Sequence, residues 1–141
     1  MANVTLEQAN TIIDVAMQTG RDGKMRALSV AVVDAGGNLV AFNKADGAGA
    51  MRFAIAFGKA YASVGMGMAS RNLDTMAQQR PHFVNALVGA SGGRVIPVAG
   101  GLLIKTHDGV TLGAVGVTGD SSDNDELAAK AGVEAVGLTT G

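Results

Sequence analysis

The segment from residue 92 to residue 119 constrains the fold more than any other part of the chain. It holds two apolar runs, residues 102–106 and 110–118, on either side of Asp108 and Gly109. An Asp-Gly pair between apolar runs is typical of a tight hairpin turn, because glycine readily adopts positive φ. The segment therefore predicts an antiparallel β-hairpin that is approached through a glycine-rich loop.

A second hairpin is predicted nearer the N-terminus. Two further runs with strand character, residues 28–34 and 39–44, flank the sequence Ala-Gly-Gly-Asn at 35–38. Residues that tolerate positive φ connect the two runs, which is a hairpin pattern. The first run is almost entirely apolar, so we expect it to be a central strand of the sheet.

Helical periodicity predicts the remaining elements. Thr5 and Gln8 form a capping-box pattern at the start of the first helix, and Ser122 is the expected N-cap of the last helix. Pro81 should end the third helix, because it disfavours helical angles at Arg80. The helices are expected at residues 6–19, 50–68 and 74–79, and from Ser122 to about 136, while residues 83–100 form the longest irregular stretch.

The order of these elements defines the fold class. Hairpins on both sides of a helical middle segment favour a mostly antiparallel sheet with helices packed on its faces, which is an α+β layered domain. A chain of 141 residues fits one domain, so residues 1–141 are expected to form a single domain.

Composition excludes several classes of function. The 11 Lys and Arg residues are balanced by 12 Asp and Glu residues, so the chain has no basic field that would gather nucleic acid. The absence of cysteine excludes disulfides, thiolate metal sites and thiol catalysis. No signal peptide and no run approaching about 20 apolar residues is found, which predicts a cytoplasmic protein without a membrane partner. Hydrophobic residues reach 48% and charged residues only 16%, so we expect a homo-oligomer.

Four stretches of the sequence carry a family resemblance. They are residues 30–39 with Val-Ala-Val-Val-Asp before Gly-Gly-Asn-Leu, Lys59-Ala60, Pro97 to Gly101, and residues 112–126 with Leu-Gly-Ala-Val-Gly-Val-Thr-Gly before an acidic helix start. On these residues the chain resembles the GlcG/HbpS family, which also supplies the C-terminal domain of PduO-type proteins. The resemblance implies a profilin-like fold, with a five-stranded antiparallel sheet flanked by helices in three α/β/α layers. It also implies a domain that binds a small ligand, either haem or another tetrapyrrole or planar organic molecule.

His82 is the main candidate for chemistry. Imidazole is a common ligand of haem iron and a common acid or base in catalysis, and His82 precedes the expected irregular stretch. The alternative is a solvated or capping histidine. Some members of the family carry an iron-binding histidine in the first helix, whereas this chain has no histidine before His82.

Two cations on the second helix are candidate ligand-binding residues. Arg52 and Lys59 could hold a carboxylate, a propionate or a phosphate. Lys59 could instead be a surface charge at the end of the helix or form an ion pair with a strand carboxylate. Phe83, Gly100 and Gly101 are expected to line the same ligand site, because they belong to or adjoin the irregular stretch.

The resemblance and these residues together leave three functions open. The first is a haem-binding or related small-ligand domain. The second is a cofactor-free enzyme of a catabolic pathway that acts on an organic acid, with Arg52 or Lys59 as carboxylate clamp and His82 as acid or base. The third is a structural or regulatory subunit without chemistry, so the sequence leaves open whether the chain is an enzyme.

Overall fold

The chain folds around one antiparallel sheet. The computed structural model describes residues 2–141, and its strands are β1 (Ser29–Asp34), β2 (Leu39–Lys44), β3 (Gly101–Lys105) and β4 (Thr111–Thr118). Their order in the sheet is β2-β1-β4-β3, and every neighbouring pair is antiparallel. Both predicted hairpins are therefore confirmed, and so is the central position of β1.

The expectation of five strands is wrong for residues 2–141, because the sheet has four. At the position beyond β3, a fifth strand is replaced by a single bridge between Lys105 and Thr139. The chain there follows a turn at Gly137, whose φ of 75° is not an extended conformation. The extension of the sheet is thus limited to one pair of residues.

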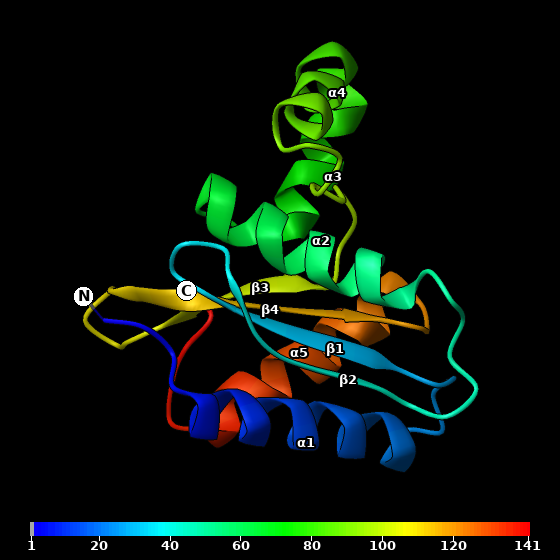
Figure 1. Ribbon diagram of the computed structural model, residues 1–141, viewed down its shortest axis with the longest axis vertical. Helices are drawn as coiled ribbons and strands as arrows, with labels where there is room; N and C mark the ends of the chain where they lie inside the picture. Colours follow the sequence, from blue (N-terminus) through cyan, green and yellow to red (C-terminus); the bar gives the residue numbers. More distant parts are fainter. Residues whose placement is uncertain (1) are drawn as a thin grey trace.

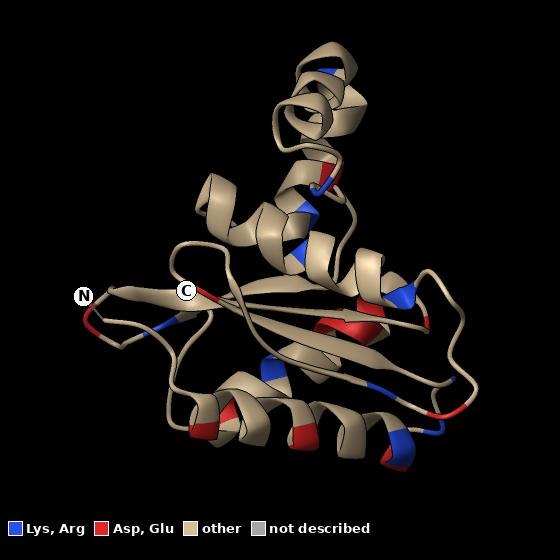
Figure 2. Cartoon of the chain, in the orientation of Figure 1, with Lys and Arg blue, Asp and Glu red and all other residues tan. Residues whose placement is uncertain are grey.

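Helices cover both faces of the sheet, which confirms the α+β class. The helices are α1 (Leu6–Asp22), α2 (Arg52–Met66), α3 (Ser70–Gln79), α4 (Pro81–Ala90) and α5 (Ser122–Ala135). Helices α1 and α5 lie below the sheet in Figure 1 and α2 lies above it, while α3 and α4 rise from α2 as an arm. Acidic residues of α1 lie on the side of the helix that faces away from the sheet (Figure 2).

Small aliphatic side chains form the core. On the face of α1 and α5 the buried residues include Ile12, Val30, Val115 and Val117, and on the face of α2 they are Val33, Ala60 and Ala114. Glycines bring α2 onto the sheet, because a Cβ atom at Gly116 would lie 2.0 Å from the carbonyl oxygen of Ala56. The helix backbone therefore rests directly on β4, and this close contact fixes the position of every side chain on α2.

The expectation of an irregular conformation for residues 83–90 is wrong. They belong to α4, in which Pro81 is the first residue. Proline at the first helical position lacks only an N–H that has no helical partner anyway, and its φ already suits a helix. Pro81 thus separates α3 from α4 at Arg80 and begins a helix as well as ending one.

Other boundaries differ from the sequence expectations by a few residues. Helix α1 keeps the predicted capping box of Thr5 and Gln8 but continues to Asp22, and α3 begins at Ser70. The N-cap of α5 is Ser121, whose side chain accepts a hydrogen bond from the N–H of Asn124, and not Ser122. Among residues 2–141, no helix has the length and apolar character needed to cross a membrane.

Candidate functional site

Arg52 and Lys59 line one cavity, which we call the Arg52 cavity. The two residues are seven positions apart on α2, so they lie on the same face of the helix. The cavity has a volume of about 420 Å³ and lies where the start of α2 meets the segment before β3 and the turn between β4 and α5. Its lining residues are Met51, Arg52, Ile55, Lys59, Ile96, Val98, Thr118, Asp120, Ser122 and Asp125.

Lys59 is a buried charge with a buried partner. Its side chain is 2% exposed, and its Nζ atom donates to the carbonyl oxygen of Val117 at 2.9 Å and to Oδ2 of Asp125 at 3.1 Å. The other carboxylate oxygen of Asp125 accepts the N–H of Asp120 at 2.9 Å. Lys59 therefore forms an ion pair, which is one of its expected roles, although the carboxylate comes from α5 and not from a strand.

Burial and pairing act on this ion pair in opposite directions. Burial lowers the pKa of Lys59 and raises the pKa of Asp125, because a charged group loses its hydration in the protein interior. The attraction between the two groups opposes both shifts. A charge left alone at either position would therefore be strongly unfavourable.

Arg52 remains available to an acidic ligand. Its Nη1 atom donates to Oγ1 of Thr118 at 2.8 Å, and its side chain is half-buried. In the described part of the chain Arg52 forms no ion pair with a carboxylate, in contrast to Lys59. Arginine can bind a carboxylate through two parallel N–H groups, so Arg52 is the group in this cavity best suited to hold one.

Asp120 closes the rim of the cavity. Its carboxylate accepts the backbone N–H of Arg26 at 2.9 Å and the side-chain amide of Asn124 at 2.8 Å. These hydrogen bonds to the ionised form, the one from the Arg26 backbone first, hold the pKa of Asp120 well below its usual value. The loop before β1 is thereby tied to the start of α5.

This arrangement predicts a loss of stability in acid. A carboxyl group whose pKa is depressed in the folded state stabilises that state above its unfolded pKa of 3.8, and the stabilisation is lost as pH falls below that value. Asp120→Asn should therefore weaken the dependence of the unfolding free energy on pH below about 4, measured by urea unfolding. Asp14→Asn, which removes an exposed carboxyl on α1, should leave this dependence unchanged. Equal pH dependence in Asp120→Asn and the parent would contradict the prediction.

His82 and Phe83 lie away from this cavity. His82 is exposed in the first turn of α4, and it lines neither the Arg52 cavity nor the other cavities discussed below. Phe83 is half-buried, with the guanidinium carbon of Arg80 4.5 Å from its ring centroid. The enzyme alternative requires His82 to lie close to Arg52 or Lys59, and the structure does not bring these residues together.

Gly100 and Gly101 position Lys59 and do not line the cavity. A Cβ atom at Gly100, where φ is +130°, would lie 2.8 Å from Nζ of Lys59, and one at Gly101 would lie 2.3 Å from the carbonyl oxygen of Lys59. Both glycines are buried beneath α2. Ile96 and Val98, which also belong to the stretch expected to be irregular, line the cavity instead.

Sequence reasoning does not reveal the roles of Asp125 and Thr118. The acidic residues after Gly119 have the pattern of a helix N-terminus, so capping is the simplest interpretation of Asp125 from the sequence. Asp125 lies 66 positions from Lys59, and Thr118 lies 66 positions from Arg52, so no local spacing reveals either contact. Among residues 2–141, no group of three or more His, Asp or Glu side chains is placed to hold a metal ion.

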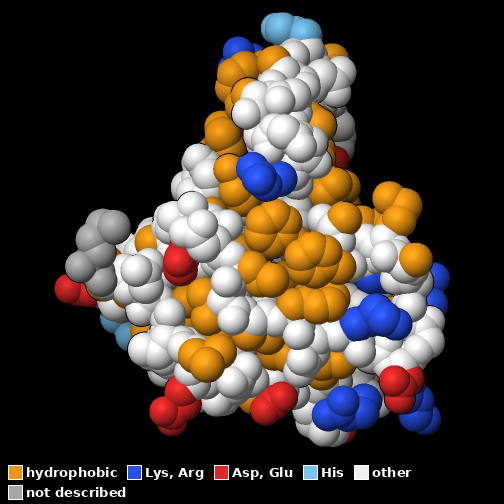
Figure 3. All heavy atoms as spheres, in the orientation of Figure 1, with side chains coloured by type: hydrophobic (Ala, Val, Ile, Leu, Met, Phe, Trp, Pro, Cys, Tyr) orange, Lys and Arg blue, Asp and Glu red, His pale blue; other side chains and the backbone are white. Residues whose placement is uncertain are grey.

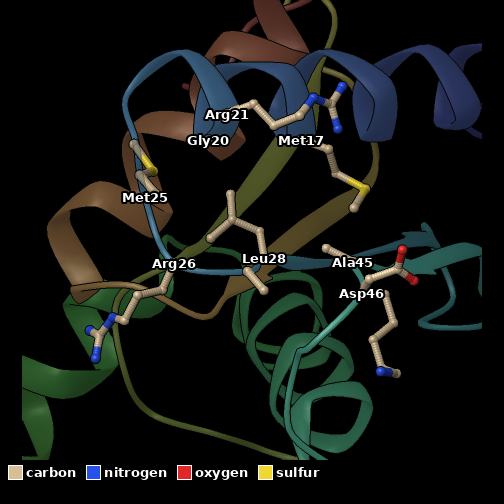
Figure 4. A pocket seen from close by; sticks show the side chains of 10 residues that line it. Met17, Gly20, Arg21, Met25, Arg26, Leu28, Ala45 and Asp46 are labelled. Atoms are coloured by element: carbon tan, nitrogen blue, oxygen red, sulfur yellow. The ribbon is translucent and has the colours of Figure 1, made fainter.

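A second cavity of about 410 Å³ lies at the C-terminal end of α1. Its walls include Met17, Met25 and Leu28, and Figure 4 shows the side chain of Arg26 pointing away from those of Arg21 and Met17. Arg26 already contacts Asp120. None of the site residues that the sequence predicts lines this cavity.

Comparison with known proteins identifies the family. The family model described as haem degrading protein HbpS-like matches residues 4–134. A crystal structure of HbpS is similar over 96% of this chain and 92% of that chain, with 29% identity and a TM-score of 0.83. The crystal structure of a double mutant of HbpS from Streptomyces reticuli is similar over 96% of this chain and 88% of that chain, with 28% identity and the same TM-score. A complex of PduOC with haem has 21% identity over 99% of both chains and a TM-score of 0.86, which shows the shared fold. No curated protein sequence matches the chain. Because the family model covers nearly all of the residues, the chain belongs to the family of HbpS-like haem degrading proteins.

Proposed function

We propose that this chain is a haem-binding domain and that the Arg52 cavity holds the ligand. The observation that carries the proposal is Arg52 itself, a half-buried cation without a carboxylate partner among residues 2–141, in a cavity with one apolar wall. Haem combines a planar apolar ring with carboxylate groups. Another tetrapyrrole, or a planar organic acid with the same combination, would meet the same requirements.

The lining residues fit such a ligand. Ile55, Ile96 and Val98 offer an apolar wall to a ring, and Arg52 offers N–H donors to a propionate. Met51, which is 71% exposed at the rim, carries a thioether, a known ligand of haem iron, and no histidine of the described residues lines the cavity. Bound haem would supply an iron centre for redox or oxygen chemistry. The protein would bind the propionate, cover one ring face and exclude water from it.

The family supports the same function. Its members are described as haem degrading proteins, and the PduOC structure with the same fold is a complex with haem. No observation favours the alternative of a cofactor-free enzyme, because its proposed acid or base, His82, lies apart from Arg52 and Lys59.

Removal of the Arg52 side chain tests the proposal. Arg52→Ala should weaken haem binding roughly ten- to hundredfold, because a hydrogen bond to a charged group contributes about 1.5–3 kcal/mol. Haem is titrated into the protein, and the Soret band gives the dissociation constant. Lys130→Ala, which removes an exposed cation from α5 outside the cavity, should bind haem like the parent.

A further variant distinguishes the two places where haem could be held. If His82→Ala abolishes or shifts the Soret band and Arg52→Ala does not, the ligand binds at α4 and the Arg52 cavity is the wrong site. If the parent protein produces no Soret band with haem, the proposed function itself is wrong.

We also propose that the chain forms a homo-oligomer. The arm of α3 and α4 extends from the body (Figure 1), and α4 contains no Asp, Glu, Lys or Arg and buries only Val84. An apolar projection of this kind is favourable when it packs against another subunit. Light scattering should give a mass of at least twice 14.1 kDa at micromolar concentration, and a mass near 14.1 kDa would exclude the oligomer.

A further inference from the structure

Four of the five aromatic side chains lie together on one surface. Phe42 on β2 and Phe53, Phe57 and Tyr61 on α2 form a continuous series, which we call the aromatic row. Only Phe83 lies outside the row. In a chain with so few aromatic residues, this clustering requires a physical reason.

Neighbouring rings of the row are in contact, but only Phe53 and Phe57 are close to parallel, since the planes of Phe57 and Tyr61 differ by 43°. The three residues of α2 are four positions apart, so they follow one face of the helix. The ring centroids of Phe53 and Phe57 are 5.7 Å apart with an interplanar angle of 15°, and those of Phe57 and Tyr61 are 5.8 Å apart. Phe42 meets the ring of Phe53 edge to face at 4.9 Å.

Packing against the core accounts for only part of the row. Phe57 and Tyr61 pack partly against buried aliphatic clusters, but none of the four aromatic side chains is itself fully buried. Phe53 is 42% exposed, and Phe42, Phe57 and Tyr61 are only partly buried. Figure 3 shows hydrophobic side chains gathered over α2 and β2 in the middle of the face that it presents. Exposed aromatic clusters are typical of binding surfaces.

A cavity with one cation adjoins the row. It has a volume of about 330 Å³ and is lined by Phe53, Phe57, Tyr61 and Arg94, with the hairpin turn before β2 as its other wall. The guanidinium carbon of Arg94 is 5.6 Å from the ring centroid of Tyr61, and Arg94 forms no ion pair with a carboxylate among residues 2–141. Positive charge is thus placed at the Tyr61 end of the aromatic row.

The turn is shaped to lie against the row. Gly37 has a φ of 82°, and a Cβ atom there would lie 3.0 Å from Cε2 of Tyr61. Glycine therefore permits both the turn conformation and the close contact with the ring. The cavity shares no lining residue with the Arg52 cavity, so it is a separate site.

We propose that the cavity beside the aromatic row binds a small planar aromatic carboxylic acid. The ring of the ligand lies against Phe53, Phe57 and Tyr61, where offset stacking is favourable, and its carboxylate pairs with Arg94. The complementarity of charge selects an acid, and the aromatic side chains favour a ligand with an aromatic ring of its own. This inference does not depend on haem binding at Arg52.

Three probes test the two parts of the proposal. Calorimetry with 2-naphthoate should detect binding, whereas 2-naphthamide, which lacks the charge, and cyclohexanecarboxylate, which lacks the aromatic ring, should bind at least about tenfold more weakly. The chain has one tyrosine and no tryptophan, so its intrinsic emission reports on Tyr61 alone. Naphthoate should quench this emission after correction for its own absorbance.

Matched variants locate the site. Arg94→Gln and Phe57→Leu should each weaken naphthoate binding about tenfold or more, with the far-ultraviolet circular dichroism of the parent retained. Arg80→Gln and Phe83→Leu alter the other arginine and aromatic pair, at α4, and should leave binding unchanged. Haem binding should be insensitive to Arg94→Gln, and naphthoate binding should be insensitive to Arg52→Ala.

Two results would overturn the proposal: naphthoate fails to bind the folded parent, or it binds equally well to Arg94→Gln and the parent. In the first case, a lower oligomer mass for Phe57→Leu would show that a second copy of the chain covers the aromatic row.

Discussion

Asp125→Ala is expected to destabilise the protein by about 3–5 kcal/mol, because it leaves the Lys59 ammonium buried without its counter-charge. Both side chains are 2% exposed, so water cannot replace the lost carboxylate unless the structure opens. Urea unfolding followed by circular dichroism measures the difference. Asp123→Ala, in which an exposed carboxylate of the same helix is removed, should cost less than about 1 kcal/mol.

A double variant separates the lost charge from the lost packing. Lys59→Met replaces the ammonium with an apolar side chain of similar length, and on its own it leaves the Asp125 carboxylate buried without its cation. Lys59→Met combined with Asp125→Ala removes both charges, so it should be more stable than Asp125→Ala alone. If the double variant is less stable than Asp125→Ala, the pair contributes mainly through packing, and the interpretation as a compensated buried charge is wrong.

Gly101→Ala is expected to cost about 3 kcal/mol or more, at the upper end of the range for overpacked positions. The added methyl group would lie 2.3 Å from the carbonyl oxygen of Lys59 and 2.8 Å from Oγ of Ser63, and the first of these is backbone that cannot rotate away. Helix α2 would have to move off β3, which would also disturb the contacts of Lys59. Gly101→Val should yield no folded protein.

The matched control for this variant is Gly89→Ala on α4. A methyl group added at Gly89 would meet no heavy atom within 4 Å apart from its chain neighbours and the backbone of its own helix. Since the residue does not have positive φ, alanine should leave stability unchanged or raise it by about 1 kcal/mol. Thermal unfolding of both variants makes the comparison. Equal melting temperatures for Gly101→Ala and the parent would show that α2 does not rest on β3 as described.

Local sequence signals account for most of the elements. The capping box at Thr5 and the turn at Asp108-Gly109 depend on contacts within a few residues, and both predictions are confirmed. Helix α4 is not predicted from the sequence, because it has no distinct polar face and because Pro81 can begin a helix as well as end one. Gly101 is predicted from the sequence to line the ligand site, whereas the structure places it where the backbones of β3 and α2 approach closely.

Sequence patterns are enough to predict the family, the α+β class, the two hairpins and the candidates Arg52 and Lys59. The difference between the two cations is visible only in the folded chain. Lys59 is paired with the carboxylate of Asp125, while Arg52 donates to the hydroxyl of Thr118 and forms no ion pair among residues 2–141. Local patterns do not reveal this difference, because burial and pairing depend on groups 66 positions away along the chain, which the packing of α2 against β4 and α5 brings within hydrogen-bond distance.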